Sequence, residues 1–206
     1  KKERLDTKKL VEEGYFLQEI LTNKGDVGVQ IITSGPESDE RNIEDAYIKM
    51  ISLAKKRIYI QTPYFIPDET FMKAIILAKK SGVDVKIMIP KKPDKKFVYY
   101  VTLSYIKRLL EIGVEVYLYK GFIHSKTILV DDLAVAIGTC NMDNRSFALN
   151  FEISAVLYGE QFVDKNKKIF WQDMDNSEIL TKQAYKRRFL SSKFAQAILR
   201  LFSPLM

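Results

Sequence analysis

The single histidine of the chain lies two residues from a lysine, and this pair of side chains can act on a phosphate group. His124 and Lys126 fall within residues 123–130, a run with the β-branched, apolar composition of a strand. Side chains two apart on an extended strand point to the same face, so we expect the imidazole and the ammonium side by side. An imidazole can take up or release a proton near neutral pH, and an ammonium stabilises negative charge.

Two more polar residues follow the next predicted strand. Residues 133–137 are predicted to pair with residues 123–130 in a hairpin, and Thr139 and Asn141 come directly after it. Their hydroxyl and amide groups can donate hydrogen bonds to the same spot as His124 and Lys126. Such a set of donors suits the oxygen atoms of a phosphoryl group.

Asp131 completes the pattern His-x-Lys-x4-Asp and is a candidate catalytic residue, although two observations favour a structural role. Its position on the strand points it away from His124, and it lies at a turn, where Asp is common. The other residues also have plain structural alternatives. A lone histidine is most often an ordinary surface or core residue, and Thr139 or Asn141 could cap the following helix, for which Asp143 is better placed.

The elements that must position these residues alternate between strands and helices up to Gly121. We predict strands at residues 27–33, 57–62, 83–89 and 114–119, and helices at 43–54, 71–80 and 97–111. After the hairpin we predict a short helix at 144–149, a strand at 151–158 and helix to the end. This alternation predicts an α/β fold with a mixed, largely parallel β-sheet flanked by helices on both faces.

We expect a peripheral helical segment at residues 1–26 and one catalytic domain at residues 27–206, which ends in a basic helical tail from about residue 160. After Gly159, nine Lys or Arg residues stand against five acidic residues, with apolar residues between them. Such a tail could lie on an anionic bilayer. The alternative is a helix packed on the sheet with its charges in water.

The composition of the 206 residues, 47% hydrophobic and 29% charged, is that of a globular protein and excludes disordered and collagen-like classes. The net charge of +7 favours a polyanionic partner, either nucleic acid or anionic lipid. One Cys and one His exclude an intramolecular disulfide and a Cys/His zinc cluster. No apolar run is long enough for a transmembrane segment, and the start at Lys1, without a signal peptide, predicts a fragment or a processed piece.

These motifs resemble those of a known superfamily. Residues 124–131, HSKTILVD, together with 138–141, GTCN, resemble the HKD motif of the phospholipase D superfamily. The stretches 141–147 and 150–152 are similar to those of bacterial cardiolipin synthases, as are 61–67, 82–90 and 203–205. The resemblance runs from about residue 27 to residue 206.

The resemblance implies a site that joins two HKD motifs. One histidine attacks phosphorus and forms a phosphohistidine, while the other protonates the leaving alkoxide and then deprotonates the incoming hydroxyl. Lys126, Thr139 and Asn141 would hold the phosphoryl oxygens, and Glu152 would hydrogen-bond the imidazole and fix its tautomer. Glu152 could instead be an exposed strand residue. The resemblance implies neither a metal nor another cofactor.

With one HKD motif and one histidine, the chain cannot form a two-histidine site alone. We therefore expect the C-terminal catalytic half of a cardiolipin synthase, a phosphatidyltransferase that joins two phosphatidylglycerol molecules and releases glycerol. The expected location is the cytoplasmic face of the bacterial cell membrane. The expected partners are the N-terminal HKD half or a second copy of this chain, together with anionic phospholipid at the membrane surface; nucleic acid is not expected.

Three questions stay open on the sequence. The resemblance favours His124 as the general acid and base, but in a symmetric pair of copies either histidine could attack. The chain could instead be a homodimeric phosphodiesterase or nuclease, for which the positive charge is also suitable. It could also be a membrane-surface lobe without activity in isolation.

Overall fold

The structure, a computed structural model, describes residues 27–38 and 40–189. The predicted peripheral helix at residues 1–26 and the last part of the predicted tail lie outside the described residues.

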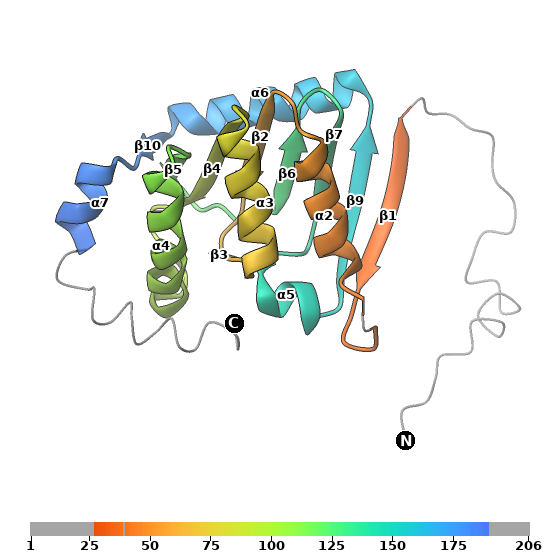
Figure 1. The fold of residues 1–206 in the computed structure, drawn as a ribbon, viewed down its shortest axis with the longest axis horizontal. Helices are drawn as coiled ribbons and strands as arrows, with labels where there is room; N and C mark the ends of the chain where they lie inside the picture. Colours follow the sequence, from red (N-terminus) through yellow and green to blue (C-terminus); the bar gives the residue numbers. More distant parts are fainter. Residues whose placement is uncertain (1–26, 39, 190–206) are drawn as a thin grey trace, which may run out of the picture.

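The centre of the fold is an eight-stranded sheet with the strand order β1-β9-β7-β6-β2-β4-β5-β10 (Figure 1). The strands are β1 (Gly28–Ser34), β2 (Arg57–Gln61), β4 (Asp84–Pro90), β5 (Glu115–Tyr119), β6 (Thr127–Val130), β7 (Ala134–Gly138), β9 (Glu152–Tyr158) and β10 (Ser177–Ile179). The prediction of a mixed α/β fold is confirmed.

The share of parallel pairing is smaller than predicted. Within the eight-stranded sheet, only the β2–β4 and β4–β5 pairs are parallel, because helices connect these strands by crossovers. The β6–β7 pair is antiparallel because a tight turn joins the two strands, and β1, β9 and β10 also pair antiparallel with their neighbours. The description of the sheet as largely parallel is therefore wrong for the sheet as a whole and holds only for β2, β4 and β5.

Helices cover both faces of the sheet, as predicted. Figure 1 shows α2 (Asn42–Leu53), α3 (Glu69–Lys80) and α4 (Lys96–Glu111) on one face, whereas α6 (Glu160–Asp175) packs on the opposite face. Successive side chains of β2 point to opposite faces of the sheet, so this strand packs against the helices on both sides. Ile58 and Ile60 enter the larger core under α2 to α4, while Tyr59 points the other way and stacks on Phe170 of α6, with ring centroids 4.8 Å apart.

Two of the helices, α3 and α5, begin at an aspartate that caps them. The side chain of Asp68 accepts a hydrogen bond of 2.8 Å from the backbone N–H of Phe71 at the start of α3. Asp143 does the same for Ser146, at 2.7 Å, at the start of α5 (Asn144–Ala148). Each cap satisfies a donor that the first helical turn leaves unpaired, which fixes where the helix begins.

Three short strands were not predicted. β3 (Phe65–Ile66) and β8 (Met142–Asp143) form a small parallel sheet of their own, which ties the segment after β2 to the residues after Asn141. The third, β10, interrupts the predicted helical tail between α6 and α7 (Lys182–Phe189), so the tail is not continuous helix. Within the described residues, the helices are too short or too polar to cross a membrane.

Candidate active site

The predicted site residues, apart from Asp131, gather at one end of three neighbouring strands. His124 and Lys126 precede β6, Thr139 follows β7, and Glu152 begins β9. The backbone N–H of Gly138 donates to the Lys126 carbonyl at 3.2 Å, and that of Thr139 donates to the Ile153 carbonyl at 2.9 Å. The antiparallel order β6–β7–β9 thus brings together residues that lie up to 28 positions apart.

His124 and Lys126 are in direct contact. The Nζ of Lys126 lies 3.0 Å from Nδ1 of His124 and donates to the His124 carbonyl at 2.7 Å. The two residues lie in extended chain just before β6 rather than on the strand itself, yet the alternation of side chains still holds. The imidazole is exposed, whereas Lys126 is only 7% exposed. The His124 ring is therefore open to solvent, and the buried Lys126 ammonium lies directly against it.

Burial changes the acid–base chemistry of the lysine. Loss of hydration lowers the pKa of Lys126, and the negative charges of Glu152, Asp143 and Asp94 oppose this shift. A buried ammonium next to an exposed ring is a strong attractor for an anion, because little water screens its charge.

Thr139 and Glu152 form a second pair beside this cation. The hydroxyl of Thr139 donates to one carboxylate oxygen of Glu152 and accepts from the backbone N–H of Ile153 at 3.0 Å. The other oxygen of Glu152 accepts from Asn150 Nδ2 at 3.1 Å. The predicted hydrogen bond from Glu152 to the imidazole is absent between these described residues. Glu152 acts here on Thr139 and, through its charge, on Lys126.

Asn141 lies beside α5 and has unused hydrogen-bonding capacity. Its Nδ2 donates to the Ser146 hydroxyl at 3.3 Å, while its Oδ1 is buried and, within the described part of the chain, has no partner. The neighbouring carboxylate of Asp143 is buried, and burial raises its pKa. A buried amide oxygen without a partner is uncommon in folded proteins, so Asn141 is a candidate for a role beyond packing.

Asp131, the last predicted site residue, lies away from the other site residues. It follows the far end of β6 and adopts a positive φ of 54°, a conformation that Asp tolerates. Its carboxylate accepts hydrogen bonds from the backbone N–H groups of Lys55, Lys56 and Arg57 at 2.7–2.8 Å. The side chain thus fixes the entry into β2.

We expect Asp131→Ala to lower the free energy of unfolding by about 2 kcal/mol, because three backbone donors lose their acceptor. Chemical denaturation measures this change. Asp132→Ala is the matched control: Asp132 forms ion pairs with Arg57 and Lys167 at the surface, and its loss should cost less than about 1 kcal/mol. Equal losses for the two variants would contradict the structural role of Asp131.

The structure adds residues that sequence reasoning missed. Phe122 is exposed and lies nearly parallel to the His124 ring, with centroids 6.0 Å apart and 12° between the planes. Asp94, in the loop before α4, acts on Lys126 through its charge and accepts a hydrogen bond of 2.5 Å from the Tyr64 hydroxyl. The position of Phe122, two residues before His124, could have indicated that the two rings lie together. No local signal in the sequence indicates that Asp94 acts on Lys126.

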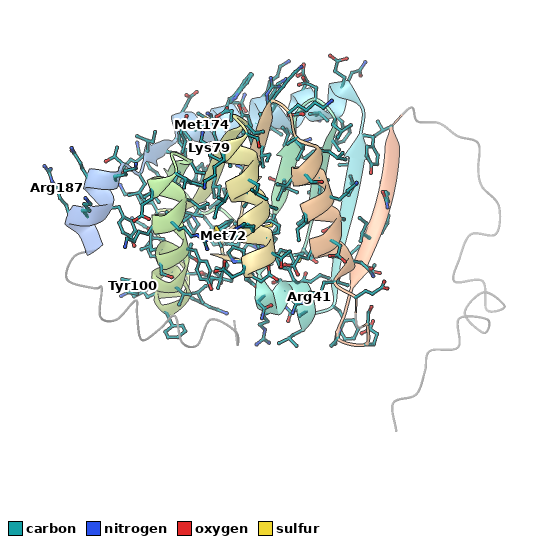
Figure 2. All side chains as sticks on the ribbon, viewed as in Figure 1. Arg41, Met72, Lys79, Tyr100, Met174 and Arg187 are labelled. Carbon is teal, nitrogen blue, oxygen red and sulfur yellow. The ribbon has the colours of Figure 1, made fainter. Side chains whose placement is uncertain are left out.

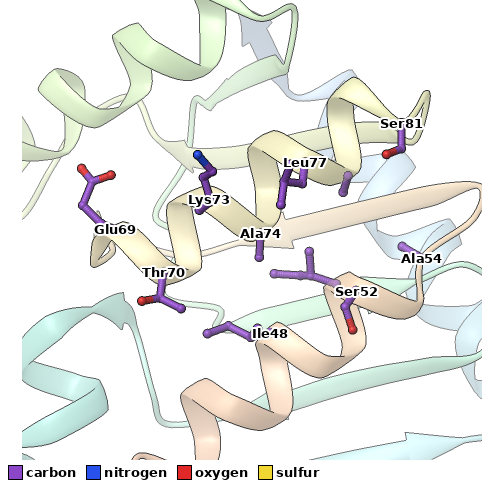
Figure 3. Close-up of a pocket in the computed structure, with 11 residues that line it drawn as sticks. Ile48, Ser52, Ala54, Glu69, Thr70, Lys73, Ala74, Leu77 and Ser81 are labelled. Atoms are coloured by element: carbon purple, nitrogen blue, oxygen red, sulfur yellow. The ribbon is translucent and has the colours of Figure 1, made fainter.

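Other features of the described surface lie away from this cluster. A groove of about 810 Å³ runs between α2 and α3 and is lined by residues such as Ile48, Ala74 and Leu77, but by none of the site residues (Figure 3). Within residues 27–38 and 40–189, no group of three or more His, Cys, Asp or Glu side chains could hold a metal ion.

A comparison with protein families finds a match that spans more than half of the chain. The family described as "Cardiolipin synthase, PLD-like domain" matches residues 47–174, which contain the whole His124 cluster. The chain belongs to this family. The matched segment includes the β6–β7 hairpin, β9 and α6 except for its last residue.

Relatives of this PLD-like chain extend well beyond it. The cardiolipin synthase of Listeria monocytogenes serotype 4a is 48% identical over 184 residues, which are 89% of this chain and 38% of the relative. The cardiolipin synthase of Staphylococcus aureus strain Mu50 is 50% identical over 183 residues, 88% of this chain and 37% of the relative. The chain therefore spans less than half the length of these relatives.

Solved structures show the same fold at lower identity. The phospholipase D family member Nuc from Salmonella typhimurium has a TM-score of 0.64 and 23% identity, and the match covers 76% of this chain and all of Nuc. The phosphatidylserine synthase of Haemophilus influenzae has a TM-score of 0.70 and 19% identity, with coverage of 87% and 48%. Both likenesses place this chain in the PLD fold.

Proposed function

We propose that this chain is the C-terminal catalytic half of a cardiolipin synthase, which transfers a phosphatidyl group from one phosphatidylglycerol to the hydroxyl of another and releases glycerol. The observation that carries the proposal is the buried Lys126 ammonium against the exposed His124 imidazole, inside the matched family segment. Phosphodiester transfer requires such a pair, because charge accumulates on the phosphoryl oxygens while protons move at the bridging oxygens.

The reaction needs a second imidazole, supplied by another segment of the polypeptide or by a second chain. That imidazole attacks phosphorus and forms a P–N bond while the bridging P–O bond to glycerol breaks. His124, in its imidazolium form, gives a proton to the leaving alkoxide. It then takes the proton of the incoming hydroxyl, whose oxygen displaces the attacking imidazole and restores both groups.

The contact between Lys126 and His124 has a consequence for this cycle. While the ammonium occupies Nδ1, this nitrogen holds no proton of its own. When a phosphodiester binds, its oxygens compete with Nδ1 for the N–H groups of Lys126, and an Nδ1 released in this way can hold a proton while Nε2 serves as acid and base. Substrate binding thus prepares the ring for proton transfer.

The remaining polar residues bind the phosphoryl group in this proposal. Thr139 is held by Glu152 and the Asn141 amide by its bond to Ser146, so both are positioned before substrate arrives. The second hydrogen on Asn141 Nδ2 can be donated to a phosphoryl oxygen. The carboxylate of Glu152 also keeps Lys126 charged by its proximity. The acceptor alcohol competes with water, and exclusion of water by the lipid and the second half favours transfer over hydrolysis.

The lowered pKa of Lys126 predicts an unusual pH dependence of anion binding. A lysine is charged below its pKa, so this one loses its charge at a lower pH than an ordinary lysine. We expect the affinity for sulfate, measured by calorimetry, to begin to fall below pH 10.5, the ordinary pKa of a lysine, and to be about tenfold lower once the ammonium has lost its charge. Sulfate itself does not titrate in this range.

Lys126→Arg is the matched variant, because an arginine stays charged throughout the range and should keep its affinity for sulfate. Lys120→Ala removes an exposed lysine nearby in the sequence and should leave the wild-type profile unchanged. A wild-type affinity that stays constant up to pH 10.5 would show that Lys126 does not bind the anion.

Product analysis tests the proposed activity directly. The complete polypeptide encoded by the gene, incubated with phosphatidylglycerol vesicles, should form cardiolipin and glycerol in equal amounts, as measured by mass spectrometry. The 206-residue chain alone should form neither. Phosphatidic acid instead of cardiolipin would indicate a hydrolase. Cleavage of DNA by this chain alone, with binding that weakens steeply with salt, would indicate the nuclease alternative.

We also place the enzyme at the bacterial cell membrane with the site on the cytoplasmic side. The phosphatidylglycerol substrate resides in that bilayer, and the loop that carries Asp94, whose charge acts on Lys126, also carries Lys92, Lys95 and Lys96. Cations in this position attract anionic lipid to the mouth of the site.

A further inference from the structure

Asp94 is a carboxylate placed where the proposed substrate carries negative charge. It is exposed in the loop between β4 and α4, and its charge acts on Lys126. A carboxylate in this position repels a phosphodiester and so weakens its binding. Glu152 and Asp143 also oppose the lowered pKa of Lys126, and both act on it more strongly than Asp94 does. The repulsion by Asp94 therefore requires a separate explanation.

The fold brings the loop of Asp94 to the same end of the sheet as Lys126. β4 runs parallel to β2, and Gln61 at the end of β2 pairs with Thr127, the neighbour of Lys126 at the start of β6. The chain therefore leaves β4 at the end where the site residues gather. Figure 2 shows Tyr100, near the start of α4, toward the end of the fold that α5 also occupies.

Two hydrogen bonds hold the Asp94 carboxylate in place. The Tyr64 hydroxyl donates to Oδ2 at 2.5 Å, and the backbone N–H of Lys95 donates to Oδ1 at 2.7 Å. Partial burial acts to raise the pKa of Asp94, but these hydrogen bonds and the charge of Lys95 lower it overall. An ionised carboxylate offers about four acceptor positions, so this exposed group can accept further hydrogen bonds.

The charges around Asp94 select the kind of donor that it can bind. The Lys95 ammonium lies over the Tyr64 ring, 6.0 Å from its centroid, and Lys92 and Lys96 are exposed in the same loop. These cations repel a ligand with an ammonium group. A ligand of the Asp94 carboxylate must therefore donate hydrogen bonds without carrying positive charge, and a hydroxyl group meets both requirements.

Resting on the proposed function, we infer that Asp94 determines specificity for the alcohol by accepting a hydrogen bond from the glycerol headgroup. This headgroup carries two neighbouring hydroxyl groups, of which one reacts. Asp94 accepts from the other, which orients the reacting hydroxyl toward His124. Water and simple alcohols lack the second hydroxyl and gain nothing from this contact, so the carboxylate favours transfer to glycerol over transfer to them.

Competition between two alcohols that differ by one hydroxyl tests this inference. The complete polypeptide is incubated with phosphatidylglycerol vesicles and equal concentrations of 1,2-propanediol and 1-propanol, and mass spectrometry measures both phosphatidyl alcohols. In each transfer the P–O bond to glycerol breaks, a P–O bond to the added alcohol forms, and glycerol leaves with the proton of that alcohol. We expect the wild type to favour the diol, and Asp94→Asn to lower the ratio of diol product to propanol product at least about tenfold, because a charged hydrogen bond is lost.

The ratio of the two products does not depend on the amount of folded enzyme, so a merely structural role of Asp94 would leave it unchanged. Tyr64→Phe removes one of the bonds that hold the carboxylate and should lower the ratio about threefold. Asp45→Asn is the matched control. Asp45 is an exposed carboxylate on α2, which α3 separates from α4 in Figure 1, and this variant should keep the ratio of the wild type.

The outcomes separate this inference from the proposed function. If Asp94→Asn forms less of both products at an unchanged ratio, Asp94 acts only through the charge of Lys126 and the inference is wrong. Equal formation of both products by the wild type also overturns it. In both cases, formation of cardiolipin leaves the proposed function in place. Absence of cardiolipin and of both phosphatidyl alcohols would overturn the proposed function and the inference together.

Discussion

Replacement of His124 by alanine is expected to reduce phosphatidyl transfer by the complete polypeptide about 10³-fold or more, because both proton transfers of the cycle lose their donor and acceptor. The cardiolipin formed from phosphatidylglycerol vesicles measures the loss. The melting temperature should stay unchanged, because the imidazole is exposed and, among the residues that the structure describes, its hydrogen bond is to the Lys126 side chain.

Ser125→Ala is the matched control for this variant, since Ser125 is an exposed neighbour in the same extended segment. Its activity should remain within about twofold of the wild type, as for most surface substitutions. Transfer at a near-normal rate by the His124→Ala enzyme would rule out the proposed role of the imidazole, and a large fall in melting temperature would assign the effect to folding.

Replacement of Gly138 by alanine is expected to lower the free energy of unfolding by about 3 kcal/mol, equivalent to a melting temperature about 10 °C lower. A Cβ atom at this position would overlap the Ile153 carbonyl oxygen and the Ser154 hydroxyl, and would lie 2.7 Å from the Ser154 Cα. These are mainly backbone atoms of β9, so the strands must separate. The buried hydrogen bond of 2.8 Å between Ser154 and Tyr47 would be strained as well.

The effect should extend to the site, because Thr139 follows Gly138 directly and depends on β9 for its contact with Glu152. Sulfate binding by the folded variant should therefore weaken. Gly28→Ala is the matched control: it is also a strand glycine paired with β9, and its Cβ would meet Tyr158 at an ordinary 3.5 Å. Calorimetric melting of both variants checks the prediction, and equal stability of the two would contradict it.

The site was accessible to prediction because its signals are local. The two-residue spacing of His124 and Lys126 fixes their common face whether or not the segment pairs as a strand, and the structure shows them 3.0 Å apart. Asp131 illustrates the same rule, since its alternation and turn position favoured the structural role that its three backbone hydrogen bonds show.

What could not be predicted depends on contacts between distant segments. The bond from Thr139 to Glu152 requires the register of β7 against β9, and the influence of Asp94 on Lys126 requires a loop that precedes the motif by about 30 residues. Likewise, β3, β8 and β10 have two or three residues each and become strands only through their partners. Such short segments carry no periodicity of their own.

The separation of Asp131 from His124 along β6 affects how a saturation mutagenesis map of this motif will look. Selection for soluble expression should tolerate most codons at position 124 and deplete nearly all at 131, since the carboxylate there organises the start of β2. Selection for lipid product should deplete both. Subtracting one map from the other would sort the residues of a single sequence signature into those retained for chemistry and those retained for architecture.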